Sequence, residues 1–355
     1  MSAPHFAING FGRIGRSAFR VWWQYYRSEV TLRAINTSGS MDIADWAHLI
    51  KYDSNYGVFD EKIEVVEHQK AKNVSDSDPF LGVLIVGQYH IQVLAQRDPA
   101  KLPWDALRVQ TVVESTGAFT SPDKAGLHLK GGANCVIISA PPKGSEIGTY
   151  VIGVNHQQLK HSPQAIISNA SCTTNCVAPV AAVINQAFGI EKAMMTTVHA
   201  YTDDQNLQDN SHRDLRRART AGKNIIPTST GAAIAVTETI PELKDKFDGL
   251  SLRVPIATGS ISDMVFVTKT KTSVEEVNQV LKQAARSSHW QGILAVTDEP
   301  IVSSDIVGRR ESSIVDLALT QVIGGDLVKV VSWYDNEWGY CNRLIEQVIL
   351  SCSHL

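Results

Sequence analysis

The feature that most constrains the fold of this chain is a set of three glycines, Gly10, Gly12 and Gly15, spaced as Gly-x-Gly-x-x-Gly. The apolar run Phe6–Asn9 before it predicts a buried strand, and Ser17 to about Tyr26 predict a helix after it. In this context Gly10 permits a tight turn, Gly12 lets the backbone approach a pyrophosphate, and Gly15 lets the helix pack on the strand. The pattern predicts a dinucleotide-binding unit built on a parallel sheet.

Strand and helix signals alternate along the first half of the chain, as a doubly wound parallel sheet requires. The pattern predicts further strands at 31–35, 85–94, 109–113 and 135–139, and a helix at 122–129. We expect the strand at 85–94 to be an antiparallel insertion. Because ligands bind beyond the carboxyl ends of parallel strands, polar residues that follow two of these strands are candidate cofactor ligands, namely Ser115, Thr116 and Ser139.

The residue after the second strand bears on the choice of cofactor. The dinucleotide fingerprint expects Asp or Glu there, to accept hydrogen bonds from the adenine ribose hydroxyls. This chain has Thr37 instead, followed by Ser38. A carboxylate would repel a 2′-phosphate, whereas hydroxyls can donate to one. The sequence therefore predicts a weakened preference for NAD over NADP, unless this loop varies without consequence.

A second informative stretch, Ser168–Cys176, is rich in Ser, Thr and Asn and contains Cys172. An apolar run at 164–167 predicts a strand before it, and an apolar helical pattern continues from Cys176 to Phe188. At a helix N-terminus, unpaired N–H groups and the positive end of the macrodipole lower the pKa of a thiol and attract anions. The alternative interpretation is a buried structural cysteine.

A histidine, His199, follows a strand-like run at 192–198. A cysteine and a histidine held on separate elements are the parts of an activated-thiol catalyst, in which the histidine takes the proton. Cys172 and Cys176 could instead share a metal ion, but no second pair stands at zinc-like spacing, so we expect no metal site. The five cysteines indicate no disulfide framework.

Composition argues against several other classes of protein. The 355 residues are enough for two domains, and the net charge of −3 gives no electrostatic footprint for nucleic acid or an anionic membrane. No signal-peptide pattern opens the sequence, and no long uncharged apolar run could span a membrane. We therefore expect a cytoplasmic protein that binds neither nucleic acid nor membranes.

Six blocks of the sequence resemble phosphorylating glyceraldehyde-3-phosphate dehydrogenases, in that family's order and over nearly the whole chain. They are Asn9–Arg16, Ser168–Cys176, His199–Thr202, Arg213–Arg219, Pro227–Ala233 and Trp333–Tyr340. The resemblance implies an α/β protein. A Rossmann-type dinucleotide-binding domain would span 1–170, completed by a C-terminal helix at 337–355, and an α+β catalytic domain with a mixed sheet would span 171–336.

The resemblance also implies a homotetramer, with an S-shaped loop at about 201–226 between subunits. The basic run Arg213–Arg219 is then better explained by pairing at an interface than by nucleic acid.

The implied reaction is the oxidation of glyceraldehyde 3-phosphate to 1,3-bisphosphoglycerate, with reduction of NAD or NADP. Cys172 would form a thiohemiacetal and then a thioester, and inorganic phosphate would release the acyl group. His199 would act as general base and help keep the thiol ionised. Of the two anion sites that this needs, the one for the substrate phosphate is implied to use Thr202, Asp204 and Arg253, and the one for the attacking phosphate Ser171, Thr173, Thr230 and Gly231. Asp204 should orient donors, because a carboxylate does not bind phosphate directly.

Two departures from the NAD-specific members of the family point to NADP. Those members usually carry Asp at the position of Thr37 and Leu-Pro in place of Asn210-Ser211, whereas photosynthetic members that use NADP have a Ser at the second position. We therefore expect NADP to be accepted or preferred, with Thr37, Ser38, Ser211 and Arg97 around its 2′-phosphate. Asn336 would hold the nicotinamide amide and Tyr340 would pack near the ring. The complete expected set of cofactor-binding residues is Gly10, Gly12, Arg13, Ile14, Gly15, Thr37, Ser38, Arg97, Ser115, Thr116, Ser139, Ser211, Asn336 and Tyr340.

Two other functions stay open at this point. Erythrose-4-phosphate dehydrogenase, a relative, shares the cysteine and the histidine but tends to lack Tyr201 and Thr202. A nucleotide-binding protein that has lost catalysis would serve as an interaction module, although intact Cys172 and His199 argue against it. The chemistry runs in both directions, so glycolysis, gluconeogenesis and carbon fixation are all compatible with these residues.

Overall fold

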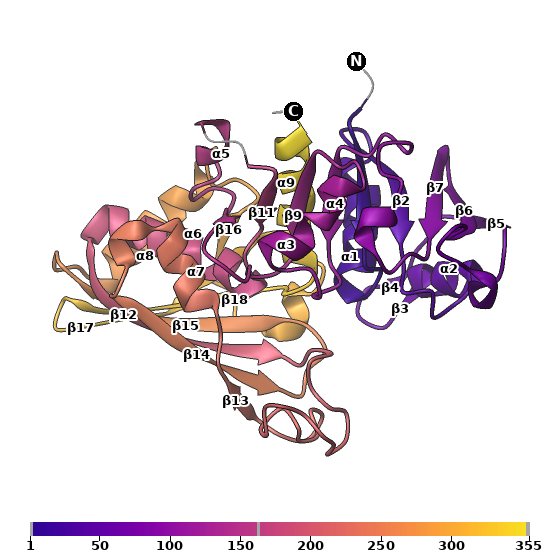
Figure 1. The fold of residues 1–355 in the computed structure, drawn as a ribbon. Helices are drawn as coiled ribbons and strands as arrows, with labels where there is room; N and C mark the ends of the chain where they lie inside the picture. Colours follow the sequence, from indigo (N-terminus) through magenta and orange to yellow (C-terminus); the bar gives the residue numbers. More distant parts are fainter. Residues whose placement is uncertain (1–2, 162–163, 353–355) are drawn as a thin grey trace. The chain divides into compact units, whose positions relative to one another are not determined.

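The computed structural model describes residues 3–161 and 164–352. The chain divides into two compact units, each with its own large sheet (Figure 1). The first unit comprises Met1–Thr149, Gln157–Asn169 and Cys341–Leu355, and the second comprises Tyr150–His156 and Ala170–Tyr340.

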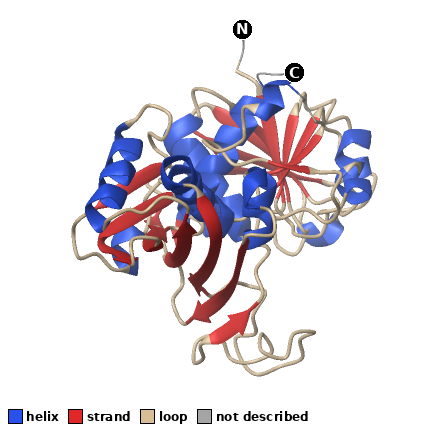
Figure 2. Cartoon of the chain, turned by 90° about the vertical axis from the view of Figure 1, so that its left-hand side faces the viewer, coloured by secondary structure: helices blue, strands red, loops and turns tan. Residues whose placement is uncertain are grey.

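The sheet of the first unit has nine strands in the order β10-β11-β9-β8-β1-β2-β7-β6-β5. Their bounds are β1 (His5–Asn9), β2 (Thr31–Asn36), β5 (Ile63–Glu67), β6 (Phe80–Val86), β7 (Tyr89–Leu94), β8 (Thr111–Glu114), β9 (Cys135–Ile138), β10 (Gly148–Thr149) and β11 (Ile166–Ser168). All neighbours from β10 to β7 are parallel, and the strands fan out with the usual twist (Figure 2). The chain order reverses between β1 and β8, which is where open parallel sheets bind ligands.

The three glycines shape the loop that leaves β1. Gly10 has φ +95°, and a Cβ there would lie 2.7 Å from the backbone nitrogen of Thr116. A Cβ on Gly15 would lie 2.2 Å from the carbonyl oxygen of Gly10, so helix α1 (Arg13–Val21) packs directly on this loop. A Cβ on Gly12, the N-cap of α1, would meet no described atom within 4 Å. The loop is therefore tight beneath Gly10 and Gly15 and open above Gly12.

Three predicted elements of the first unit differ in detail. The single strand at 85–94 is wrong: a turn at Gly87, with φ +55°, separates β6 from β7. Strand β6 is antiparallel to both of its neighbours, whereas β7 is parallel to β2. The helix at 122–129 is also wrong as one element, because it is two short helices, α3 (Pro122–Ala125) and α4 (Leu127–Lys130), that meet at Gly126, a weak helix former. The helix predicted to end at Tyr26 finishes in a π-helical turn, Trp22–Tyr26.

The second unit contains a mixed sheet of seven strands in the order β13-β14-β12-β15-β18-β17-β16. Their bounds are β12 (Ile190–Ala200), β13 (Ile226–Thr228), β14 (Phe247–Val254), β15 (Ser260–Thr268), β16 (Leu294–Thr297), β17 (Ser313–Ile323) and β18 (Leu327–Tyr334). Helix α6 (Cys172–Phe188) packs on β12, β15, β17 and β18, α7 (Ala232–Thr239) on β14, and α8 (Val274–Arg286) on β16 and β17. The predicted fold class, a Rossmann-type unit plus an α+β unit with a mixed sheet, is confirmed.

The remaining elements complete the two units. In the first unit these are α2 (Ile43–Lys51), the small hairpin of β3 (Tyr52–Asp53) and β4 (Gly57–Val58), and α5 (Gln158–His161). Helix α9 (Trp338–Cys352) contributes its residues from Cys341 onwards to the first unit, where the hydroxyl of Tyr26 donates to Asn342 Oδ1 and Leu344 is fully buried. No described helix is both long and apolar enough to cross a membrane.

Candidate functional site

Cys172 is the first residue of α6, in the second unit. Ala170 turns the chain into the helix with a left-handed backbone, φ +57°, which is uncommon for a residue other than glycine. Ser171 is the N-cap, and its Oγ accepts a hydrogen bond of 3.0 Å from the backbone N–H of Thr174. The thiol therefore lies at the positive end of a 17-residue helix, with part of its surface accessible.

His199 lies next to this thiol because of strand register. It sits near the end of β12, and its Nε2 is 3.4 Å from Cys172 Sγ. Strands β12 and β14 are parallel, and their register places Arg253 opposite His199. The Arg253 guanidinium approaches His199 Nδ1 at 2.9 Å and donates to the carbonyl oxygen of Ala200 at 3.1 Å. A thiol, an imidazole and a guanidinium are thus brought together.

Burial sets the resting charge of this group. It raises the pKa of the Cys172 thiol, against the lowering effects of the Arg253 charge and of a hydrogen bond from the Thr173 backbone N–H. Burial, assisted by Arg253, lowers the pKa of His199 to about 3. The resting pair is therefore a thiol beside a neutral imidazole, which differs from the expectation that the thiol is kept ionised.

The neutral imidazole can act as a base in one of its two tautomers. His199 Nδ1 lies 2.6 Å from the carbonyl oxygen of Ala200, to which an Nδ1–H donates. Nε2 then carries its lone pair towards Cys172 Sγ and can take the thiol proton as the sulfur attacks. We assign this tautomer because the Ala200 carbonyl oxygen can only accept. Arg253 then donates to that same oxygen, and its approach to Nδ1 is not a hydrogen bond.

Thr173 is held in a chain of hydroxyl groups. Its Oγ1 lies 2.8 Å from the hydroxyl of Tyr334, which lies 2.8 Å from Thr197 Oγ1, which donates to the carbonyl oxygen of Ile261. Since each hydroxyl has one proton, the end of the chain at Ile261 fixes the direction of the others. The Thr173 hydroxyl therefore donates to Tyr334 and offers an anion only an oxygen. Donation to phosphate from this residue would have to come from its backbone N–H.

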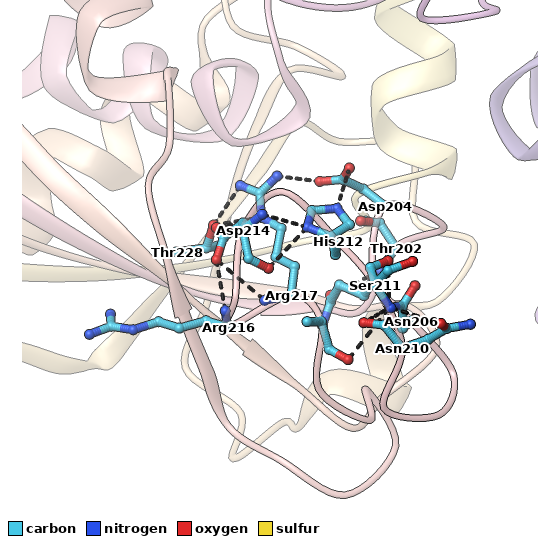
Figure 3. Close-up of polar contacts among 12 residues, drawn as sticks. Thr202, Asp204, Asn206, Asn210, Ser211, His212, Asp214, Arg216, Arg217 and Thr228 are labelled. Carbon is cyan, nitrogen blue, oxygen red and sulfur yellow. Dashed lines mark hydrogen bonds and ion pairs between the residues drawn. The ribbon is translucent and has the colours of Figure 1, made fainter.

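The loop between β12 and β13, residues 201–225, corresponds to the predicted S-shaped loop, and its polar contacts centre on Arg217 (Figure 3). The Arg217 guanidinium donates to Asp204 and, through Nε at 2.8 Å, to Thr228 Oγ1. His212 approaches the same Asp204 carboxylate at 3.6 Å. Asp204 thus orients the Arg217 guanidinium rather than facing an anion itself.

Arg217 is a residue that the sequence reasoning missed as a candidate for the site. Its charge and that of Asp204 both act on Arg253, whose charge in turn acts on Cys172. A second guanidinium therefore lies within electrostatic range of the one beside His199. The signal in the sequence was the basic run, which we assigned to an interface. Within the chain, Arg217 pairs with Asp204 and Arg219 pairs with Asp209.

Other residues expected around the anions lie in the second unit. Gly231 is the N-cap of α7, and Thr230 Oγ1 accepts from the backbone N–H of Ala232 at 3.1 Å, which leaves its own proton to donate. The Thr202 N–H donates to Gln205 Oε1 at 3.3 Å. Ser211 is exposed on the loop, and its N–H donates to Asn210 Oδ1.

The residues expected at the nicotinamide are also in the second unit. Asn336 Oδ1 accepts hydrogen bonds from the N–H of Gly259 at 3.1 Å and from Ser260 Oγ at 2.8 Å. Its Nδ2 is thereby the end available to donate to a carboxamide oxygen. The hydroxyl of Tyr340 donates to the carbonyl oxygen of Ala170 at 3.1 Å, which ties α9 to the turn before Cys172.

The first unit has a hollow of about 380 Å³ around the glycine loop. Of the expected cofactor ligands, the hollow is lined by Gly10, Gly12, Thr37, Ser38, Arg97, Ser115 and Thr116. The first-unit residues Arg13, Ile14, Gly15 and Ser139 do not line it, and the Arg13 guanidinium pairs instead with Asp53 at 2.6 Å. The lining residues that sequence reasoning missed are Asn9, Phe11, Asn36, Trp46, Gln96 and Phe119.

Thr37 contributes less to this hollow than expected. It is buried, and its hydroxyl donates to the carbonyl oxygen of Leu94 at 3.1 Å, so its single proton is not available for a phosphate. Ser38 and Arg97 are the expected donors that remain at this end of the hollow. Thr37 therefore bears on the choice of cofactor because it places no carboxylate there, and not because it donates a hydrogen bond.

The hollow fits a dinucleotide. Gly12 leaves its floor open to a pyrophosphate beside the N-terminus of α1, where unpaired N–H groups favour anions. Among the described residues that line it, none is acidic, and Arg97 is the one cation. Within residues 3–161 and 164–352, no group of three or more His, Cys, Asp or Glu side chains could hold a metal ion.

Comparison with known proteins agrees with both units. Residues 5–122 match the family model described as the glyceraldehyde 3-phosphate dehydrogenase NAD binding domain, and residues 171–336 match that family's C-terminal domain. The chain is 48% identical over 343 residues to glyceraldehyde-3-phosphate dehydrogenase 1 of Streptomyces avermitilis, covering 97% of each chain. It is 47% identical over 340 residues to glyceraldehyde-3-phosphate dehydrogenase 2 of Synechocystis, covering 96% of each. It is also 49% identical over 331 residues to the chloroplastic glyceraldehyde-3-phosphate dehydrogenase A of Scenedesmus vacuolatus, covering 93% of this chain and 100% of that one.

The charge of Arg253 predicts how the reactivity of the Cys172 thiol depends on pH. The Arg253 charge lowers the pKa of Cys172, so Arg253→Leu should raise that pKa and move the pH profile of Cys172 alkylation to higher pH. Alkylation by iodoacetamide at neutral pH should then slow by at least about threefold. Arg219→Leu, which removes an exposed arginine paired with Asp209, is the control and should leave the profile in place. A profile that Arg253→Leu does not move would contradict the electrostatic role.

Proposed function

This chain belongs to the glyceraldehyde-3-phosphate dehydrogenase family and is an NAD(P)-dependent oxidoreductase that acts on an aldehyde group, and we propose that its reaction is the phosphorylating oxidation of glyceraldehyde 3-phosphate. The observation that carries the proposal is the Cys172–His199 pair, 3.4 Å apart at the N-terminus of α6 and beside Arg253. The family assignment gives the cofactor class, and this pair supports the proposed covalent chemistry.

The first step forms a covalent bond to the substrate. Cys172 Sγ attacks the aldehyde carbon, and His199 Nε2 takes the thiol proton. That proton passes to the carbonyl oxygen as its π electrons move there, which gives a thiohemiacetal. The N-terminus of α6 and the Arg253 guanidinium favour the negative charge that develops on sulfur and then on oxygen.

The second step is the oxidation. His199 takes the thiohemiacetal hydroxyl proton, the C=O bond re-forms, and the hydrogen on the same carbon leaves with its electron pair as hydride. The nicotinamide dinucleotide, when bound, supplies the acceptor for that hydride. Asn336 would orient the carboxamide of the nicotinamide through Nδ2, since Oδ1 is already held by Gly259 and Ser260.

The third step releases the acyl group to phosphate. An oxygen of inorganic phosphate attacks the thioester carbon, the C–S bond breaks, and the thiolate takes back the proton that His199 holds. Arg253 and Arg217 supply guanidinium forks of the kind that bind phosphate oxygens, with Thr230 as a hydroxyl donor. The product is an acyl phosphate, 1,3-bisphosphoglycerate.

We further propose that NADP is accepted, and preferred over NAD. Support comes from a hollow whose described lining has no carboxylate. It also comes from Ser38, which follows β2, and Arg97, which follows the neighbouring strand β7, at the end of the hollow where the 2′ group of the ribose is expected. Ser211, in the second unit, stays a predicted ligand of the 2′-phosphate.

The proposed assembly is a homotetramer with the loop 201–225 at subunit contacts. Support comes from large apolar side chains that this loop exposes in the single chain: Leu207 and Leu215 are 78% and 81% exposed, and Ile225 is 67% exposed. Apolar side chains gathered on one loop are typical of protein–protein contacts.

The reaction is tested by following absorbance of the reduced nicotinamide with glyceraldehyde 3-phosphate and phosphate, using NAD and NADP at matched concentrations. We expect activity with both and a higher kcat/KM with NADP. Cys172→Ser should lower activity by at least about a thousandfold, because the alcohol replaces the nucleophile. Activity with erythrose 4-phosphate alone, or no reduced cofactor formed even in a single turnover, would overturn the proposal. Activity with NAD only would overturn the NADP part.

Thr37→Asp tests the basis of cofactor choice. A carboxylate at the end of β2 repels a 2′-phosphate and accepts hydrogen bonds from ribose hydroxyls, so kcat/KM with NADP should fall by about tenfold or more, about 1.4 kcal/mol. The value with NAD should hold or rise. Thr37→Val, which removes the hydroxyl without adding charge, should leave the ratio of the two values nearly unchanged. Equal losses with both cofactors in Thr37→Asp would contradict the charge argument.

The assembly is tested by light scattering coupled to size exclusion. We expect a mass four times that of the 38.8 kDa chain. Leu215→Asp should lower that mass by placing a charge in the contact. Met194→Asp, which charges another exposed apolar side chain, on β12, is the comparison for a loop-specific effect. A monomeric wild-type protein would rule the tetramer out.

A further inference from the structure

A carboxylate that the proposed mechanism does not use lies buried beneath the glycine loop. Glu114, the last residue of β8, is 1% exposed and accepts hydrogen bonds from Asn9 Nδ2 at 2.5 Å, from His128 Nε2 at 3.0 Å and from the N–H of Thr116 at 2.7 Å. The Thr116 hydroxyl donates to it as well. We infer that Glu114 is a positioning residue for the dinucleotide, an inference that rests on the proposed function of the hollow.

The histidine partner of Glu114 is held in one tautomer. His128 is fully buried, and its Nδ1 accepts a hydrogen bond of 3.1 Å from Trp104 Nε1. An indole N–H can only donate, so Nδ1 carries no proton and Nε2 carries the one that it donates to Glu114. His128 is therefore neutral in this arrangement. All four donors to the Glu114 carboxylate are neutral groups, two on each oxygen.

The residues that Glu114 holds are those that shape the hollow. Asn9 precedes Gly10 and Thr116 faces it, and both line the hollow. Asn9 Oδ1 accepts from Asn36 Nδ2 at 2.6 Å, so the network also reaches the end of β2. A Cβ on Gly10 would lie 2.7 Å from both the methyl group and the nitrogen of Thr116, so a small shift of Thr116 changes the space at the turn. One carboxylate thus fixes both walls of the pyrophosphate turn.

The test is Glu114→Gln in the full-length protein, with dissociation constants measured for NAD and NADP. The amide oxygen can accept from Thr116, but the amide NH₂ then faces two other donors, Asn9 Nδ2 and His128 Nε2–H. We expect both dissociation constants to rise together by about tenfold. In the absence of cofactor, the rate of Cys172 alkylation should stay within about twofold of the wild-type rate. Cys172 lies in the second unit, and the substitution changes none of the contacts described around it.

Three results would overturn the inference. They are unchanged affinity for both cofactors, a loss confined to one of them, or a loss accompanied by a change of more than about twofold in the rate of Cys172 alkylation, which would indicate that the substitution disturbs the protein as a whole. If the wild-type protein binds neither cofactor, the proposed function of the hollow fails. If wild type binds and Glu114→Gln binds equally well, the positioning role alone fails.

A matched pair at Thr116 decides the question even if Glu114→Gln does not fold. Thr116→Val keeps the methyl group against Gly10 and loses the hydroxyl that donates to Glu114, whereas Thr116→Ser keeps the hydroxyl and loses the methyl group. Weaker binding of both cofactors by the valine variant, with near-normal binding by the serine variant, is the expected result. The opposite order would show that packing, not the Glu114 hydrogen bond, positions this wall. Binding as tight as in the wild-type protein by both variants would show that neither contact positions it.

Discussion

The parallel pairing of β12 with β14 is the interaction on which the proposed chemistry depends. It places His199 opposite Arg253, and the two side chains share the carbonyl oxygen of Ala200. A shift of one residue between the two strands would place the two side chains on opposite faces of the sheet. Burial then keeps thiol and imidazole neutral at rest, so charge develops only when substrate arrives. The sheet therefore sets the position of the base, and burial keeps the base neutral until substrate binds.

The two units offer different kinds of groups to an anion. The hollow of the first unit is lined by glycine backbone, hydroxyls, amides, aromatic rings and one arginine. The buried carboxylate of Glu114, beneath the glycine loop, accepts hydrogen bonds from neutral donors. The second unit places the Arg253 guanidinium beside His199, within electrostatic range of a second guanidinium, Arg217, that pairs with Asp204. Anions are thus met by N–H groups in one unit and by cations in the other, which suits a bound cofactor and an exchanging phosphate respectively.

Much of this could be predicted from the sequence, because the glycine spacing and the Cys172 stretch each constrain the backbone as well as the chemistry. The fold class followed from the first and from the resemblance. The turn at Gly87 was missed because apolar residues continue through it on both sides. The committed hydroxyls of Thr37 and Thr173 could not be foreseen, since their acceptors, Leu94 and Tyr334, are distant in sequence. Arg217 could not be singled out within the basic run Arg213–Arg219, because only its tertiary contacts distinguish it from the other arginines.

The left-handed backbone at Ala170 limits how this chain can vary. The residue is fully buried, and its carbonyl oxygen accepts the hydroxyl of Tyr340. Branched side chains are excluded from such a conformation, and polar ones that tolerate it would have to be accommodated without solvent. Substitution at this position is therefore restricted to alanine and glycine, whatever happens to the residues around it. A library of variants selected for activity would show position 170 as nearly invariant although it carries no functional group.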